Sequence, residues 1–377
     1  MTLMKPTTKL AVAVALIALA CVWWFAGRES KRVLASHETP ATNPTVIPAI
    51  VTETNRQPQQ NIFTAASALA SAQTAAERNP ALAQLRQALV NGSTDEKVAA
   101  IRKLLDSKTD AATGLSFKPG KNGSLAEAPT LRTFLLDELA RLDPAAAATV
   151  AREILNTSTS PDEWAVALRN LARGDTGADA RMLLASKMGE LLRNQAWQRD
   201  TAAGYLEAFD TAVFLGGTEL LSPLADLLRQ KDNPALAHAA FLALDRLAFN
   251  EPAQVLAALE KNPEWLQGRE ETRADYFARA DVSNAAQRGI VENYLLDAVR
   301  SPAELQAFAG VFPNANFMVS QNLLTESKTL DHATIVSRDA ASLKVVNAWL
   351  ADARFEKIRP QLIKLQTRLE QFVNPEK

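Results

Sequence analysis

The chain has 377 residues, of which 47% are hydrophobic, and this content is typical of a globular protein with a sizeable core. Residues 1–32 contain five basic side chains and one acidic side chain, so the formal net charge of −1 leaves −5 for the remainder. A mildly acidic body offers no broad basic surface for a phosphate backbone, and we expect no nucleic-acid partner.

The first predicted element is an uncharged apolar stretch, residues 10–26. As a helix it would rise about 26 Å, which is near the lower limit for crossing a bilayer. Trp23 and Trp24 near its end suit the headgroup region, where aromatic rings concentrate. We therefore predict that residues 1–32 form a single-pass anchor in the inner (cytoplasmic) membrane. The signal-like amino terminus places the body outside the cytoplasm, which is the periplasm if the cell is a Gram-negative bacterium.

Two alternatives stay open for this stretch. Ala18-Leu19-Ala20 resembles a signal peptidase site, which would release a secreted form. Together with Cys21 these residues also resemble a bacterial lipobox, although Ala18 stands where leucine is usual, and the protein would then be a lipoprotein. Cys21 is the single cysteine, which excludes an intrachain disulfide and a multi-thiolate metal site. The basic residues on the two sides do not assign an orientation.

Residues 33–61 are rich in Pro, Thr, Asn and Gln and poor in large apolar side chains. This composition predicts a flexible linker with an end-to-end distance of about 30 Å. Such a linker would hold the body close to the membrane.

From residue 62 onward the sequence predicts a succession of helices separated by short polar turns, and no alternating pattern indicates a long strand. Four dipeptides place a capping side chain before proline, which suits the N-cap and the first helical position. They are Asp143-Pro144, Ser160-Pro161, Asn233-Pro234 and Ser301-Pro302. Glu163 and Glu304 follow two of these N-caps at the spacing of a capping box. The predicted fold class is therefore all-α.

The predicted helix starts recur at residues 143 and 160 and at 233 and about 250, which gives a helix pair every 35 or so residues. Two apolar faces have helical spacing between these starts: Leu220, Leu221, Leu224, Leu227 and Leu228, then Phe241, Leu242, Leu244, Leu247 and Ala248. The stretch 216–259 resembles a HEAT or armadillo-like repeat, with weaker echoes in 93–107 and 130–155. The resemblance implies that residues 62–265 form an α-solenoid, a superhelix of stacked helical hairpins whose inner face binds other macromolecules. It implies no reaction.

The sequence of residues 266–377 also predicts helices, but their starts do not recur at the repeat interval. Their last segment has the a/d spacing of a coiled coil at Phe355, Ile358, Leu362, Leu365, Leu369 and Phe372. Pro360 predicts a helix start inside this seam, which shortens it. We favour a terminal helix that caps the repeats, and a dimerising or partner-binding helix is the alternative.

No residue pattern indicates a catalytic, cofactor-binding or metal site. The three histidines, His37, His238 and His332, lack zinc-motif spacing. We expect His238 to pack between helices and Asp331, beside His332, to cap a helix. Trp164, Trp197, Trp265 and Trp349 are expected in the core.

Three further motifs have simpler structural explanations. GLSFKPGKN, residues 114–122, has the wrong glycine spacing for a phosphate loop and predicts an exposed loop. Arg173-Gly174-Asp175 matches a cell-adhesion tripeptide, but Gly174 predicts the end of a helix. VFPNANF, residues 311–317, predicts a turn, and a small binding groove there is a hypothesis without further support.

We therefore expect a non-catalytic, membrane-tethered scaffold that binds another protein at the cell envelope, with no cofactor. One alternative is an envelope enzyme or enzyme subunit with a site between helices of the C-terminal third, where His332 is the first residue to test. The other is a structural or assembly protein that acts through the C-terminal helix. The partner and the oligomeric state do not follow from the sequence.

Overall fold

The computed structural model of this chain describes residues 57–373. Within them the fold is all-α, as predicted, apart from one two-stranded sheet. No helix among residues 57–373 is long and apolar enough to span a membrane. The predicted anchor at residues 10–26 and the first part of the predicted linker lie outside the described residues.

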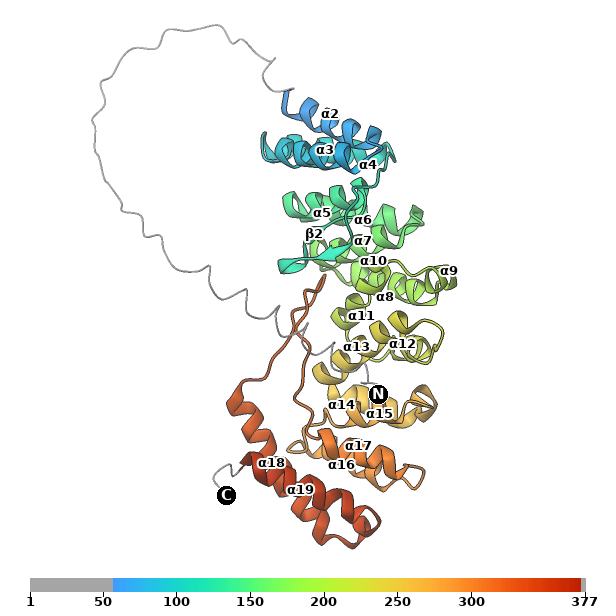
Figure 1. The fold of residues 1–377 in the computed structure, drawn as a ribbon, viewed down its shortest axis with the longest axis vertical. Coiled ribbons are helices and arrows are strands. Elements are labelled where there is room, and N and C mark those ends of the chain that lie inside the picture. Colours follow the sequence, from blue (N-terminus) through green and yellow to red (C-terminus); the bar gives the residue numbers. More distant parts are fainter. Residues whose placement is uncertain (1–56, 374–377) are drawn as a thin grey trace, which may run out of the picture. The chain divides into compact units, whose positions relative to one another are not determined.

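The first part of the fold is a succession of helices, interrupted between α4 and α5 by the two-stranded sheet (Figure 1). They are α2 (Gln57–Ser71), α3 (Ala75–Ala88), α4 (Thr94–Asp106), α5 (Leu131–Leu142), α6 (Pro144–Thr157), α7 (Pro161–Gly174), α8 (Ala178–Arg193), α9 (Gln195–Arg199), α10 (Ala203–Glu207) and α11 (Asp210–Leu215). Residues 57–61, which the composition assigned to the linker, form the first turn of α2.

The second part continues in the same way and ends in a helical hairpin. Its helices are α12 (Leu221–Leu228), α13 (Pro234–Asn250), α14 (Pro252–Lys261), α15 (Glu270–Phe277), α16 (Ala285–Leu296), α17 (Pro302–Val311), α18 (His332–Ala351) and α19 (Arg359–Val373). Three short 3-10 helices, η2 (Lys121–Gly123), η3 (Pro263–Leu266) and η4 (Ala353–Ile358), lie between these elements. Helices close in the sequence pack together: α6 on α7, α12 on α13 and α18 on α19.

The predicted helix starts are confirmed at all four capping dipeptides. Asp143, Ser160, Asn233 and Ser301 each accept a hydrogen bond from the main-chain N–H three residues later, and a proline follows each. The predicted capping boxes are wrong in one respect: the hydrogen bond from the N-cap N–H to the glutamate side chain is not formed. The side chains of Glu163 and Glu304 do not turn back to the N-cap, because they are buried and pair with arginines of other helices, Arg132 and Arg273.

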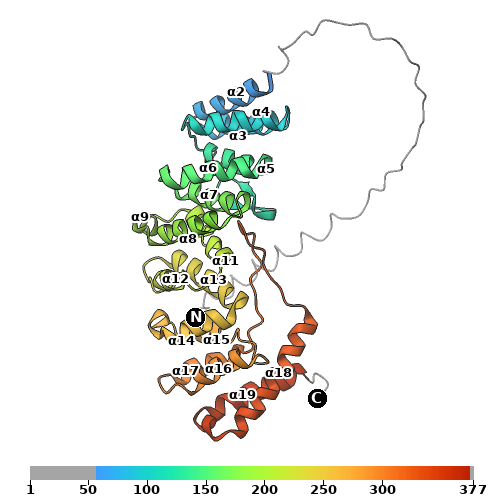
Figure 2. The same ribbon diagram turned by 180° about the vertical axis from the view of Figure 1, so that it is seen from behind.

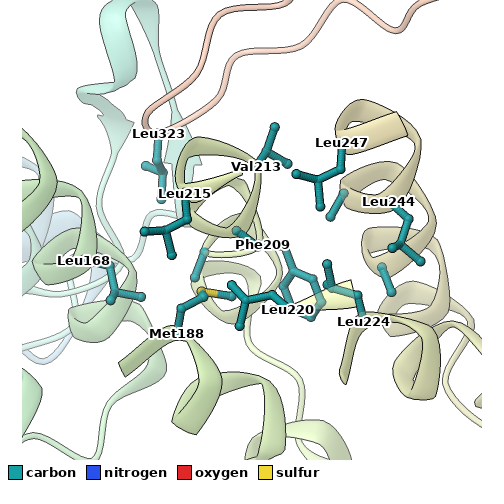
Figure 3. Packing of buried hydrophobic residues seen from close by; sticks show 14 of the residues in the cluster. Leu168, Met188, Phe209, Val213, Leu215, Leu220, Leu224, Leu244, Leu247 and Leu323 are labelled. Carbon is teal, nitrogen blue, oxygen red and sulfur yellow. The ribbon is translucent and has the colours of Figure 1, made fainter. Parts of the chain in front are cut away.

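The buried apolar residues of the described part form one cluster, part of which Figure 3 shows. All five leucines of the predicted face 220–228 are buried. On α13, Leu244, Leu247 and Ala248 are buried, whereas Phe241 and Leu242 are partly exposed. All four tryptophans expected in the core pack against or within it.

Residues 114–122 do not form a plain exposed loop, as the sequence suggested. Strand β1 (Lys118–Pro119) pairs antiparallel with β2 (Leu125–Glu127), with η2 between them. The hairpin is fastened to α5, since the Leu125 N–H donates a hydrogen bond of 3.0 Å to Asp137. Gly123, at the end of η2, is buried.

The C-terminal apolar seam is used within the chain. Phe355, Ile358, Leu362, Leu365 and Leu369 are buried, and only Phe372, 55% exposed, faces solvent. Pro360 is the second residue of α19, as its position predicted. Helix α19 packs on α17 and α18.

The connection between α17 and α18, residues 312–331, has neither helix nor strand. We call it the connector. Figures 1 and 2 show from opposite sides that it runs from α17 back to the β1–β2 hairpin and then returns to α18. The predicted turn at residues 311–317 is therefore the start of a much longer excursion. The side chain of Leu323, at its far end, is completely buried (Figure 3).

Candidate functional site

Polar side chains hold the main chain of the connector where it leaves α17. The Asn314 N–H donates a hydrogen bond of 2.7 Å to the carbonyl oxygen of Ala278. Arg279, two residues after α15, donates to the carbonyl oxygens of Asn314, at 3.1 Å, and of Asn316. These hydrogen bonds involve main-chain groups of the connector, which every amino acid except proline provides.

The connector reverses direction between Ser320 and Ser327, and its two arms are bonded to each other. The Ser327 hydroxyl accepts from the Ser320 N–H at 3.1 Å and donates to the Ser320 carbonyl oxygen at 3.2 Å. Inside the turn, the Asn322 side-chain amide donates to the Thr325 carbonyl oxygen at 3.1 Å. The turn therefore has a defined shape before it meets the helices.

Leu323 is the apolar anchor of the turn. Its side chain is 0% exposed, and its carbonyl oxygen accepts a hydrogen bond of 2.7 Å from Arg173 at the end of α7. Gly123 permits this approach, because a Cβ there would collide with the Leu323 carbonyl and the Arg173 guanidinium. Its φ of +68° is also a conformation that only glycine adopts readily. Burial and the nearby Arg169 lower the pKa of Arg173.

Asp210, the first residue of α11, is the polar anchor of the turn. Its carboxylate accepts hydrogen bonds from the N–H groups of Leu324, at 2.6 Å, and Thr325, at 2.9 Å, and from the Thr325 hydroxyl. Arg246 of α13 forms an ion pair with the same carboxylate at 2.9 Å and also contacts the Thr325 hydroxyl. Four donors match the roughly four lone-pair positions of a carboxylate, so Asp210, which is 6% exposed, is fully satisfied.

Buried or partly buried arginine–carboxylate pairs also connect helices of the described part to one another. They are Arg132–Glu163 at 2.6 Å, Arg169–Asp137 at 2.5 Å, Arg246–Asp210 at 2.9 Å, Arg279–Asp245 at 2.7 Å and Arg273–Glu304 at 3.3 Å. Burial raises the pKa of Asp245, and the adjacent Arg279 opposes the shift. Because removing one member of such a pair leaves a buried charge without a partner, these pairs fix the relative positions of the helices.

Two grooves border the connector on α13. One, of about 270 Å³, is lined largely by apolar groups, among them Leu206, Val213 and Leu242, and reaches Asn322 of the connector. The other, of about 80 Å³, lies between α13 and the first arm of the connector, next to Phe317. Leu242 lines both, so apolar surface continues along α13 beside the connector.

The first arm of the connector presents three consecutive apolar side chains to solvent. Phe317 is 40% exposed, Met318 55% and Val319 74%. The middle of the connector buries Leu323 completely and Leu324 in part, and its other contacts are the polar ones of Arg173, Asp210, Arg246 and Arg279. We call these four side chains and the two grooves the connector-binding face.

The residues singled out by sequence are only partly brought to this face. His238 is exposed on α13, where it lines the larger groove and its ring stacks on Phe241 with centroids 6.2 Å apart. The expectation that it packs between helices is therefore wrong. Asp331 caps α18 as predicted, accepting from the Thr334 N–H at 2.8 Å, and His332 is exposed beside it. His37 lies outside the described residues.

Each residue of the tripeptide 173–175 makes a structural contact within the fold. Gly174 ends α7 so close to α6 that a Cβ would collide with the Pro144 carbonyl oxygen. Asp175 pairs with Arg152 at 2.6 Å, and Arg173 holds the connector. In the described part of the chain no group of three or more His, Cys, Asp or Glu side chains is placed to hold a metal ion.

The residues that hold the connector were missed by sequence reasoning, although two signals pointed to them. Asp210 interrupts the apolar run AFDTAVFL, and Asp245 with Arg246 interrupts LALDRLAF. A charged residue inside an apolar helical run indicates a buried ion pair. The second signal is the length of sequence without helical periodicity before residue 332, since long irregular connections are often functional.

No protein-family model, no curated protein and no solved structure matches this chain. Inference about function therefore starts from the connector-binding face.

Proposed function

We propose that this protein is a non-catalytic, membrane-tethered scaffold that binds another protein at the cell envelope through its connector-binding face. In this proposal residues 10–26 span the inner membrane, and the linker that precedes α2 keeps the helical body close to it. The helical body would lie in the periplasm. The apolar stretch, the two tryptophans near its end and the Pro-rich composition of the linker support this placement.

The observation that carries the proposal is the way the helices hold an irregular stretch of polypeptide. Arg173 and Arg279 donate to main-chain carbonyl oxygens, and Asp210 accepts from two main-chain N–H groups. A surface that satisfies both donors and acceptors of a main chain has the chemistry needed to bind a nonhelical segment of any protein. The grooves on either side of the connector supply space for side chains.

We further propose that the helices form a HEAT-like α-solenoid. Helix starts at Pro144, Pro161, Pro234 and Pro252 keep the predicted interval, and neighbouring helices pack on one another along the chain. In a solenoid each repeat presents a similar surface, which makes a continuous platform for a long ligand. The tether would add to affinity, because it raises the concentration of the body near a partner in the same membrane.

No observation on the described residues specifically supports the alternatives, an envelope enzyme or an assembly protein. His332 is an exposed residue in the first turn of α18, and Tyr276 and Tyr294, buried in the C-terminal third, pack on neighbouring aromatic rings. The C-terminal seam that suggested an assembly role is buried against α17 and α18. Binding of a protein partner is the function that the geometry favours.

The proposal is tested by crosslinking the full-length protein in its native cells and purifying it in mild detergent, next to a chain that begins at Thr52. We expect both to recover the same protein partner, because the helical body is the recognition surface. Asp210→Asn in the full-length protein should reduce the recovery, whereas Asp226→Asn, in an exposed pair with Arg229, should not. Equal recovery with both variants would mean that the partner binds elsewhere.

A further inference from the structure

We infer that the connector is a displaceable occupant of a site for a segment of the partner protein, and that this segment carries a leucine followed two residues later by threonine or serine. The inference rests on the proposed function and adds two things to it. It names the chemistry of the bound segment, and it states that the partner competes with the chain's own connector.

The chemistry of the segment follows from the groups of the connector that the site contacts. Most contacts are made to main-chain groups and are indifferent to sequence. Two side chains of the turn are recognised as such: Leu323, which is completely buried, and Thr325, whose hydroxyl reaches both Asp210 and Arg246. Serine offers the same hydroxyl as threonine, so either would serve at the second position.

The site is also built to exclude other residues at these two places. Gly123 leaves room for the main chain at Leu323 only because it lacks a Cβ, and it brings the Leu323 carbonyl against Arg173. A charged side chain in the position of Leu323 would be buried in the apolar cluster without a partner. An acidic residue at the position of Thr325 would face the Asp210 carboxylate.

From residue 316 onward the connector is displaceable because it buries little for its length, whereas Phe312 and Asn314, where it leaves α17, are buried. Between Ser320 and Thr325 only Leu323 is buried, and the preceding residues Phe317, Met318 and Val319 are exposed. Segments with few buried apolar contacts open at a free-energy cost well below that of global unfolding. The Leu206–Val213–Leu242 groove lies beside the turn and is not filled by the connector, so a longer segment could bury more apolar surface than the connector does.

Competition by the connector makes a specific prediction about affinity. When a site is mostly occupied by its own chain, its apparent affinity for an added ligand equals the intrinsic affinity multiplied by the fraction of molecules in which the site is free. Leu323→Asp in the protein should release the connector and raise the affinity for an added segment by about tenfold or more. Val319→Asp, at an exposed position of the same connector, should leave the affinity unchanged.

The test uses a fluorescein-labelled peptide of residues 316–328, NFMVSQNLLTESK, added to the full-length protein in detergent, with binding read by fluorescence anisotropy. We expect the peptide to bind the Leu323→Asp protein at least tenfold more tightly than the unchanged protein or the Val319→Asp protein. A peptide in which aspartate replaces the leucine at the position of Leu323 should bind none of them. Equal binding of both peptides, or no gain from Leu323→Asp in a protein with unchanged helical circular dichroism, would overturn the inference.

Hydrogen exchange of the unchanged protein tests displacement even if Leu323→Asp does not fold. The amides of Leu324 and Thr325 should exchange at least 100-fold faster than those of α7, because the connector opens without global unfolding. Exchange as slow as in α7 would show that the connector is a permanent part of the fold and would overturn the inference.

Failure of the inference and failure of the proposed function give different results. If Leu323→Asp and the unchanged protein recover the same partner equally from crosslinked cells, the scaffold function stands and competition by the connector is refuted. If the peptide binds as expected but no partner is recovered, the site stands and the scaffold function is refuted.

Discussion

Asp210→Asn is the substitution that most directly tests how the connector is held. It keeps the size of the side chain, removes the charge opposite Arg246 and replaces one acceptor oxygen by an N–H group that faces other donors. A hydrogen bond to a charged group contributes about 1.5–3 kcal/mol, and the carboxylate accepts two from the main chain of Leu324 and Thr325. The Arg246 side chain is 24% exposed, so the ion pair itself adds about 1 kcal/mol or less.

These contributions sum to a loss of about 3–7 kcal/mol, most of it local to the connector. At 1.4 kcal/mol per factor of ten, the amides of Leu324 and Thr325 should exchange with solvent about 100-fold faster or more. The assay is hydrogen exchange followed by mass spectrometry, with Asp226→Asn as the matched control, because that carboxylate is 61% exposed. Unchanged exchange of the connector in Asp210→Asn would refute the account of Asp210 as its polar anchor.

Three further predictions follow from local features. Gly123→Ala should lower the urea midpoint of unfolding clearly more than Gly268→Ala does. Both glycines have positive φ, but only at Gly123 would an added Cβ collide with neighbouring atoms. Equal shifts of the two midpoints would refute the close approach of Leu323 to Gly123. A main-chain hydrogen bond from Ser93 lowers the pKa of Glu96 below its ordinary 4.5. The ionised carboxylate therefore stabilises the start of α4 above pH 4.5, and this contribution is lost as the pH falls through the lowered pKa. Glu96→Gln should remove that pH dependence in circular dichroism titrations, and an unchanged titration would count against it. Phe372→Ser should leave the mass measured by light scattering unchanged, since the rest of the seam is buried within the chain; a smaller mass would favour the assembly role.

The helical class and many helix starts could be predicted because their causes are local. A capping side chain before proline determines a start within a few residues, as Asp143, Ser160, Asn233 and Ser301 show. Apolar spacing identified the buried face of α12 for the same reason. The β1–β2 hairpin was missed because its two and three paired residues are too short to show an alternating pattern.

The connector-binding face could not be predicted, because its contacts join residues that are far apart in the sequence. The apolar run around Asp210 indicates a buried ion pair, but nothing in it indicates that the hydrogen-bond donors are Leu324 and Thr325, more than 100 residues away. Glu163 shows how a local rule fails in such a place. Its spacing fits a capping box, but a buried arginine on α5 offers the stronger ion pair, so the carboxylate leaves the helix end.

His238 shows the converse limit. Its place in an alanine-rich helix suggested burial, yet the helix turns that position toward the groove beside the connector. Periodicity identifies the buried face only when the apolar residues are confined to one side of the helix, and on α13 alanine, leucine and phenylalanine occur all round it.

Site-specific photocrosslinking tests the central claim, that this face binds another protein, most directly. A benzophenone amino acid would replace His238, exposed at the larger groove, in the full-length protein in its native cells, and in a second protein it would replace Ile363, 47% exposed on α19. We predict a crosslink to one partner polypeptide from position 238 and none to that partner from position 363. Crosslinks of equal yield from both positions, or none from 238, would contradict the account.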